Sequence, residues 1–95
     1  SDKVNSALSN KADKTTISSD MTLVVSNWSN NTQTLSGLTI DTNKLNTPLP
    51  SVSSLAEYAS CGIYLSAETS TSLTFTRNAT PTNVLTFKLK SEVVI

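Results

Sequence analysis

The residue types that carry most enzymatic chemistry are sparse in this sequence. It contains no His, so Ser-His-Asp and Cys-His nucleophile systems lack their general base. No Lys has a Ser three positions before it, which also excludes a Ser-x-x-Lys arrangement. A glycosidase needs two carboxylates on either side of a cleft. A chain of 95 residues seldom builds such a cleft by itself, although an interface between subunits could provide one. The acidic residues from position 20 onward are well separated in the sequence: Asp20, Asp41, Glu57, Glu68 and Glu92. We therefore expect no enzymatic activity and no catalytic residue.

Motifs for metals and cofactors are also missing from the sequence. Cys61 is the sole cysteine, which excludes an intrachain disulfide and a Cys-based metal cage. The two glycines, Gly37 and Gly62, are too few for a phosphate-binding or dinucleotide-binding loop. Residues 41–43 begin like a calcium loop, but the Gly and Glu that complete such a loop are absent. We expect no metal and no cofactor, and we interpret Cys61 as a small buried residue.

The aromatic side chains Trp28, Tyr58 and Tyr64 have the ring faces that can stack on sugar rings. Aromatic residues are few here, so we expect Trp28 to lie in the core, and a place in a surface binding site is the alternative. A bulge or bend before Trp28 is then required to turn it inward. Tyr64 has the opposite parity to Ile63 and Leu65, which predicts an exposed or intersubunit aromatic side chain.

Alternation of apolar and polar residues predicts strands that have one buried and one solvent-exposed face. The expected strands are 21–25, 33–40, 45–49, 63–67, 73–76 and 84–93. The last two flank the polar loop 77–83, which suits a hairpin with a long connection. Pro48 and Pro50 lack a backbone N–H, so the third strand is expected at a sheet edge or outside the sheet. Gly37 marks an expected bulge in the second strand.

One short helix is expected between the strands. Ser54-Leu-Ala-Glu57 fits a capping box, which predicts a helix over 55–60 that is stopped by Gly62 near its C′ position. Ser, Thr and Asn account for 40 of the 95 residues, a composition that favours short strands and polar loops. The sequence thus predicts a mainly β fold, a small antiparallel β-sandwich or compact barrel, over residues 18–95.

Residues 1–17 form a separate predicted segment. Val4, Leu8, Lys11 and Thr15 occupy the a and d positions of a seam that is apolar first and polar later. A short coiled-coil helix at the end of a longer stalk is one interpretation, and a solvated helix or linker is the other. The boundary is expected in the turn-prone stretch 15–20.

Charge and hydropathy exclude two classes of partner. Seven basic and seven acidic residues balance and are scattered singly, so no basic stripe is available for phosphates and no nucleic-acid binding is expected. No apolar run approaches the ~20 residues of a membrane helix, and we expect no membrane partner.

Segments 4–13 (VNSALSNKAD), 21–28, 72–77 and 93–95 resemble the C-terminal head modules of bacteriophage tail-fibre and baseplate proteins. In those modules a stalk precedes a strand that ends near a Trp, and a Thr/Pro loop leads to an apolar last strand. The resemblance implies a homotrimer at the end of a fibre, joined to the rest of the fibre upstream of Ser1. It also implies a place in the virion, in a tail fibre or baseplate, which is extracellular at host attachment.

A homotrimer is expected on further grounds. Two Phe, one Trp and two Tyr give a thin core, and a seam on 1–17 has no use in a monomer. The apolar end of the chain, 93–95, points to both faces and requires cover. The expected trimer interface is Val4, Leu8, Val93 and Ile95.

The first functional hypothesis is a receptor-binding module for host attachment, with a carbohydrate of the bacterial cell surface as its ligand. Its expected ligand contacts are Tyr64, Asn30, Asn31 and Arg77. The alternative is a purely structural fibre head, trimerisation cap or capsid decoration domain without a ligand. A surface-anchored bacterial adhesin domain is a third hypothesis. The polar loops 29–32 and 77–83 suit the first two hypotheses equally.

Overall fold

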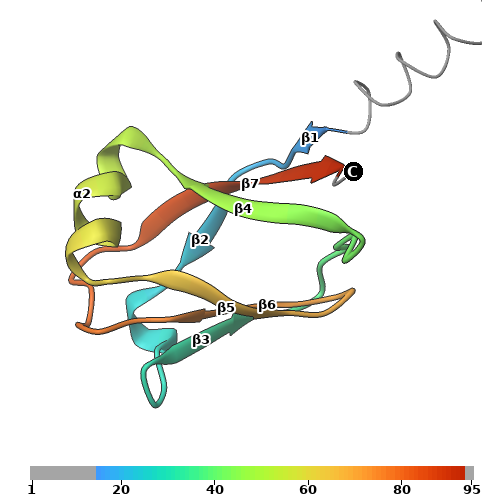
Figure 1. The fold of residues 1–95 in the computed structure, drawn as a ribbon. Coiled ribbons are helices and arrows are strands. Elements are labelled where there is room, and N and C mark those ends of the chain that lie inside the picture. Colours follow the sequence, from blue (N-terminus) through green and yellow to red (C-terminus); the bar gives the residue numbers. More distant parts are fainter. Residues whose placement is uncertain (1–14, 94–95) are drawn as a thin grey trace, which may run out of the picture.

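The computed structural model describes residues 15–93, which form two antiparallel sheets in two layers with the core between them (Figure 1). Sheet A holds β1 (Thr16–Ile17), β2 (Met21–Leu23), β4 (Lys44–Pro50) and β7 (Leu85–Val93). Sheet B holds β3 (Thr32–Leu35), β5 (Tyr64–Glu68) and β6 (Leu73–Thr76). The 3-10 helix η1 (Val25–Asn27) follows β2, and α2 (Val52–Ser60) connects β4 to β5. The prediction of a mainly β fold with antiparallel sheets is confirmed.

The expected stalk falls largely on residues 1–14, and the expected interface residues Val4, Leu8 and Ile95 also lie outside the described residues. A coiled coil and a trimer therefore remain predictions.

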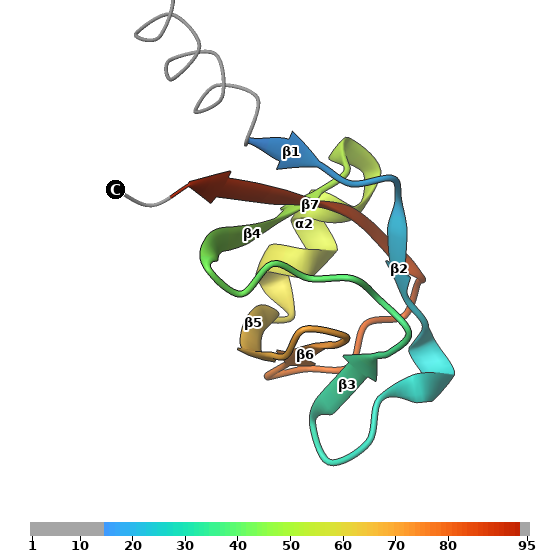
Figure 2. The ribbon, with the colours of Figure 1, turned by 90° about the vertical axis from the view of Figure 1, so that its right-hand side faces the viewer.

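Strand β7 is the centre of sheet A. It pairs with β4 along one edge, and with β1 and β2 along the other, as Figure 2 shows from the side. Alternate residues of β7 enter the core, and Leu85, Phe87 and Leu89 are all buried. Among the strands of residues 15–93, β4 has a neighbour on one side only, which confirms the edge position that Pro48 and Pro50 predicted.

Sheet B places β6 between β3 and β5. Its inward side chains are Leu73 and Phe75, both fully buried. The ring of Phe75 meets that of Phe87 from sheet A edge-on, at 5.0 Å between centroids and 61° between planes. This contact joins the two layers at the middle of the core.

The predicted hairpin of β6 and β7 is wrong, because the two strands lie in different sheets. The chain between them crosses from sheet B to sheet A beside α2. The backbone N–H groups of Asn78 and Ala79 donate to the carbonyl of Cys61 at 2.8 and 3.1 Å. Pro81 is fully buried on this path. Long-range anchors thus hold a crossover where local pattern suggested a turn.

The first two predicted strands are shorter than expected. β2 ends at Leu23, and the chain turns through η1, which provides the bend that brings Trp28 against the core. β3 ends at Leu35, and Gly37 adopts φ +72° where a bulge was expected. The chain then runs beside the β5–β6 turn, where Leu38 N donates to Thr71 O and Ile40 N donates to Ser70 O.

The predicted capping box is also wrong. Helix α2 begins at Val52 after the N-cap Ser51, whose side chain makes no capping bond. Ser54 is buried inside the helix, and its Oγ accepts the N–H of Thr86 at 2.9 Å. Gly62 follows the C-cap residue Cys61 with φ +64°, so the predicted stop is confirmed.

Residues 15–20 were expected to form turns, but Thr16 and Ile17 form β1 and pair with Ser91 and Lys90 of β7. A two-residue strand has no alternation that a sequence can show. The domain boundary near residue 17 remains a prediction.

Candidate functional site

The outer face of sheet B carries hydroxyl groups almost throughout. Leu73 and Phe75 of β6 point into the core, so Thr74 and Thr76 point outward. Residues directly opposite each other on paired strands share a face of the sheet. The partners of Thr74 and Thr76 are therefore on this outer face as well. These partners are Thr32, Thr34, Tyr64 and Ala67, and Ser66, at the register shift of β5, joins them through its hydrogen bonds to Thr74 and Thr76. We call the hydroxyl-bearing residues of this set the hydroxyl face: Thr32, Thr34, Tyr64, Ser66, Thr74 and Thr76.

Hydrogen bonds within the hydroxyl face fix several of its side chains. Thr34 Oγ1 and Thr74 Oγ1 are 3.0 Å apart, across the β3–β6 pair. Thr76 Oγ1 donates to Ser66 Oγ at 2.7 Å, and Ser66 Oγ donates to the carbonyl of Thr74 at 3.1 Å. A hydroxyl has one donor and two acceptor sites, so each of these groups keeps capacity for a ligand. The face is a flat array of oriented donors and acceptors.

Tyr64 supplies the aromatic ring of this face. It lies on the edge strand β5 directly opposite Thr76, and 53% of its surface is exposed. The predicted exposure of Tyr64 is confirmed. An exposed ring beside hydroxyl groups combines an apolar stacking surface with polar contacts.

Asn30 and Asn31 form a tight turn at one end of this face. Both have positive φ, 50° and 67°, as a type I′ turn requires, and Asn tolerates this conformation. Two hydrogen bonds between the backbones of Ser29 and Thr32 close the turn, at 2.8 and 2.9 Å. The amide N–H of Arg77, the residue after β6, donates to the carbonyl of Asn31 at 2.9 Å.

The structure thus gathers the residues predicted as ligand contacts. Asn31 and Arg77 are hydrogen-bonded, Asn30 is in the same turn, and Tyr64 lies opposite the residue that precedes Arg77. These residues come from β5, from the turn before β3 and from the end of β6, at one end of sheet B. The side chain of Arg77 has the inward parity of Phe75 and lies over the ring of Trp28.

Trp28 lies on the core side of this end of sheet B, against Arg77. The indole is partly buried and packs against the core, as the core interpretation required. The guanidinium carbon of Arg77 lies 5.6 Å from the ring centroid, within the range of a cation–π contact. Trp28 Nε1 and Arg77 Nε are both shielded from solvent and have no hydrogen-bond partner among residues 15–93.

Sequence reasoning missed most of the hydroxyl face, namely Thr32, Thr34, Ser66, Thr74 and Thr76. Their signal was present in the sequence, since each of them has the polar parity of its strand. What the sequence did not show is that β3, β5 and β6 are neighbours. The pairing of strands creates the array.

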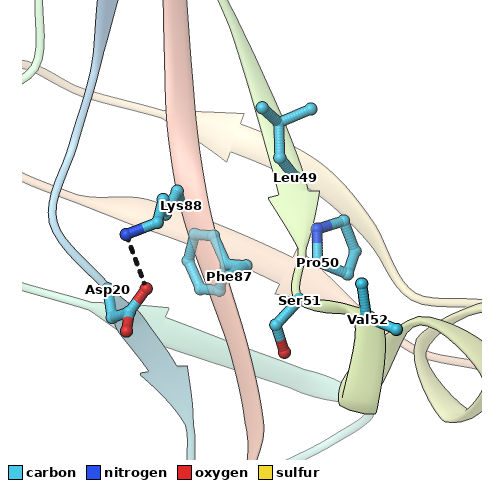
Figure 3. Close-up of a pocket in the computed structure, with 7 residues that line it drawn as sticks. All are labelled: Asp20, Leu49, Pro50, Ser51, Val52, Phe87 and Lys88. Atoms are coloured by element: carbon cyan, nitrogen blue, oxygen red, sulfur yellow. Dashed lines mark ion pairs between the residues drawn. The ribbon is translucent and has the colours of Figure 1, made fainter.

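A groove lies in the layer of sheet A, where β4 meets α2 (Figure 3). This groove has a volume of about 250 Å³, and its lining is mostly apolar. Leu49, Pro50 and Val52 form one side, and Phe87 and Lys88 form the other. No nucleophile with an adjacent base lines this groove.

Metal ligands and membrane spans are not found in the described part of the chain. Within residues 15–93 no three His, Cys, Asp or Glu side chains gather to hold a metal ion. No helix in that range has the length and apolar character needed to cross a membrane. Val93, an expected interface residue, lies at the end of β7 opposite Lys44 and is 36% exposed.

Comparison of the chain with protein-family models, curated proteins and solved structures gave no match.

Proposed function

We propose that this chain is a non-enzymatic bacteriophage fibre or baseplate module that trimerises and contacts a glycan of the host cell surface through the hydroxyl face. The observation that carries the proposal is the row of hydroxyl groups beside the exposed ring of Tyr64. Sugars present hydroxyl groups around an apolar ring face, and both kinds of surface find partners here.

The charge of the face favours a neutral or weakly acidic glycan. None of the six residues of the hydroxyl face is Asp, Glu, Lys, Arg or His, and Arg77 follows its last residue in the sequence. A strongly charged polymer would find little complementary charge in this region. The resemblance to phage head modules is consistent with such a ligand.

A purely structural module is the second candidate, favoured by a different observation. Sheet A exposes aliphatic side chains on its outer face, and aliphatic surface suits contact with protein better than contact with sugar. The two candidates differ in whether the hydroxyl face binds anything.

Binding to an array of bacterial cell-wall polysaccharides tests the proposal. We expect Tyr64→Ala to weaken binding to the retained polysaccharide by about tenfold or more, the effect of losing about 1.4 kcal/mol. Thr76→Val should weaken it by a smaller factor, because one hydroxyl is removed. Val84→Ala is the matched control, since Val84 is as exposed as Tyr64 and belongs neither to the hydroxyl face nor to an interface between copies.

Two results would speak against the adhesion proposal. One is the absence of binding to every polysaccharide on the array by the folded chain. The other is binding that Tyr64→Ala leaves unchanged, which would move the contact away from the hydroxyl face. Either result would favour the structural module.

A further inference from the structure

We infer that copies of this chain pack against one another through the outer face of sheet A. The inference rests on the proposed trimer and assigns it a surface, which we call the apolar face: Ile17, Leu45, Leu49 and Val52. The occupant of the apolar face is a second copy of the chain.

Strand register places the first three of these residues on one surface. Phe87 and Leu89 point into the core, so Lys88 and Lys90 point outward. Leu49 lies opposite Lys88, and Ile17 lies opposite Lys90. Leu45 has the same parity as Leu49, so all three side chains share the outer face.

The exposure of these side chains is high for aliphatic residues. Ile17 is 58% exposed, Leu45 55% and Leu49 39%, and Val52 at the start of α2 is 95% exposed. By comparison, the residues paired with Thr74 and Thr76 on the outer face of sheet B include no aliphatic side chain larger than that of Ala67. A gathered set of exposed aliphatic side chains marks an interaction surface more often than a solvated one.

The groove beside Leu49 indents the apolar face (Figure 3). Its lining of Leu49, Pro50, Val52 and Phe87 suits an aliphatic side chain, and its volume of about 250 Å³ leaves room for one. The apolar face of a second copy offers such side chains, whereas the hydroxyl face does not.

Charges on the apolar face are paired within the chain. Lys88 Nζ lies 3.0 Å from Asp20 Oδ1, and Lys90 Nζ lies 3.4 Å from Glu92 Oε1. The two pairs leave the face neutral, so a second copy meets no net repulsion. The aliphatic stems of both lysines add further apolar area.

Pairing through the edge of sheet A is disfavoured. The edge strand β4 contains Pro48 and Pro50, which have no N–H to offer to an added strand. On the β4 side of this layer, association therefore uses the face of the sheet rather than its edge.

The course of the chain also indicates that copies meet through sheet A. Val4 and Leu8, the expected interface residues, precede β1 in the sequence, and Ile95 follows β7. Thr16 of β1 pairs with Ser91 of β7, so both terminal segments join sheet A at the same end. Copies that meet through these segments bring their sheets A together and leave the hydroxyl face outside.

Light scattering on the full chain tests the inference. At micromolar concentration the chain should have a mass near three times 10.1 kDa. Leu45→Glu with Leu49→Glu should lower the mass about threefold, to that of one chain. Tyr64→Glu is the matched control, because Tyr64 is as exposed as Leu45 but lies in sheet B; it should leave the mass unchanged.

A second variant distinguishes loss of the interface from loss of the fold. Thr47→Arg changes a residue of the same outer face that is already polar, between Leu45 and Leu49. It should also reduce the mass while the circular dichroism spectrum stays that of the parent chain. A monomeric parent chain, or an unchanged mass in both folded variants, would overturn the inference.

Polysaccharide binding is measured on the same samples. A monomeric variant that still binds, with lower avidity, separates failure of this interface from failure of the proposed adhesion. A trimer that binds no polysaccharide would leave the interface intact and remove the adhesion proposal alone.

Discussion

The side-chain amide of Gln33 occupies the place of a neighbouring strand beside Val24. Gln33 Oε1 accepts the N–H of Val24 at 2.8 Å, and Gln33 Nε2 donates to the carbonyl of Val24 at 2.9 Å. Gln33 belongs to β3 of sheet B, whereas Val24 follows β2 of sheet A. The pair therefore links the two layers, and it satisfies both backbone groups at the point where β2 ends.

Replacement of Gln33 by Met should remove this link while keeping most of the side-chain volume. The N–H of Val24 would lose its partner, whereas its carbonyl would keep the N–H of Asn27 at 3.0 Å, and we expect the free energy of unfolding to fall by about 1–3 kcal/mol. Chemical denaturation measures the change. Ser36→Ala, an exposed site just beyond β3, is the control and should change stability by less than about 0.5 kcal/mol. Equal stability of the two variants would show that the amide pair contributes little.

Trp28→Ala should destabilise the domain by about 2–4 kcal/mol, because the indole packs against the core and beneath Arg77. Trp28→Phe should cost much less, since Nε1 has no hydrogen-bond partner within the described range and the ring contacts largely remain. Thermal melts of the two variants measure the difference. A Trp28→Ala variant as stable as the parent chain would place the ring outside the core.

Stability should depend on pH through Glu57. The hydroxyl of Thr82 donates to Glu57 Oε2 at 2.9 Å and holds the pKa of this carboxyl below its ordinary value. The N–H of Asn83 adds a bond to Oε1 at 3.1 Å. A carboxyl with a lowered native pKa contributes stability that is present above its ordinary pKa and lost as the pH falls through the native pKa.

Glu57→Gln should therefore be less stable than the parent chain near neutral pH, and the difference should shrink under acidic conditions below the ordinary carboxyl pKa. Urea midpoints at a series of pH values measure it. A difference that stays constant across the series would contradict the role of the ionised carboxylate.

Gly62→Ala should be the more costly of the two Gly→Ala substitutions. Gly62 and Gly37 both have positive φ, so Ala at either site is strained by about 1–2 kcal/mol. A Cβ on Gly62 would also lie 2.5 Å from Asn78 Nδ2, whereas a Cβ on Gly37 meets nothing within 4 Å. Differential scanning calorimetry should show the larger loss for Gly62→Ala and a partial recovery when Asn78→Ala is added. Equal losses at the two glycines would rule out the steric contact.

The sequence predicted the strands well where one face is dry over several residues. β6 and residues 85–90 of β7 alternate strictly, and their buried residues, Phe75 and Phe87 among them, were those expected from parity. Parity does not identify the neighbour of a strand, so the same pattern led to the wrong hairpin. Anchors such as the carbonyl of Cys61, which direct the crossover, are far away in the sequence.

The capping box shows the same limit for a helix. Ser54 and Glu57 have the right spacing for mutual capping, but each has a tertiary partner in the crossover or in β7. Long-range hydrogen bonds prevail over the local ones that sequence spacing suggests. Among the candidate site residues, exposure of Tyr64 followed from parity, whereas the contact of Asn31 with Arg77 depended on the pairing of β3 with β6.

Every ladder of sheet A includes β7. During synthesis β1, β2 and β4 consequently leave the ribosome without a partner, and their layer closes only after residues 85–93 emerge. Sheet B is complete earlier, when β6 has been made, but its apolar side then has no second layer. The nascent chain exposes Leu73 and Phe75 until that moment, a period in which capture by chaperones or aggregation competes with folding.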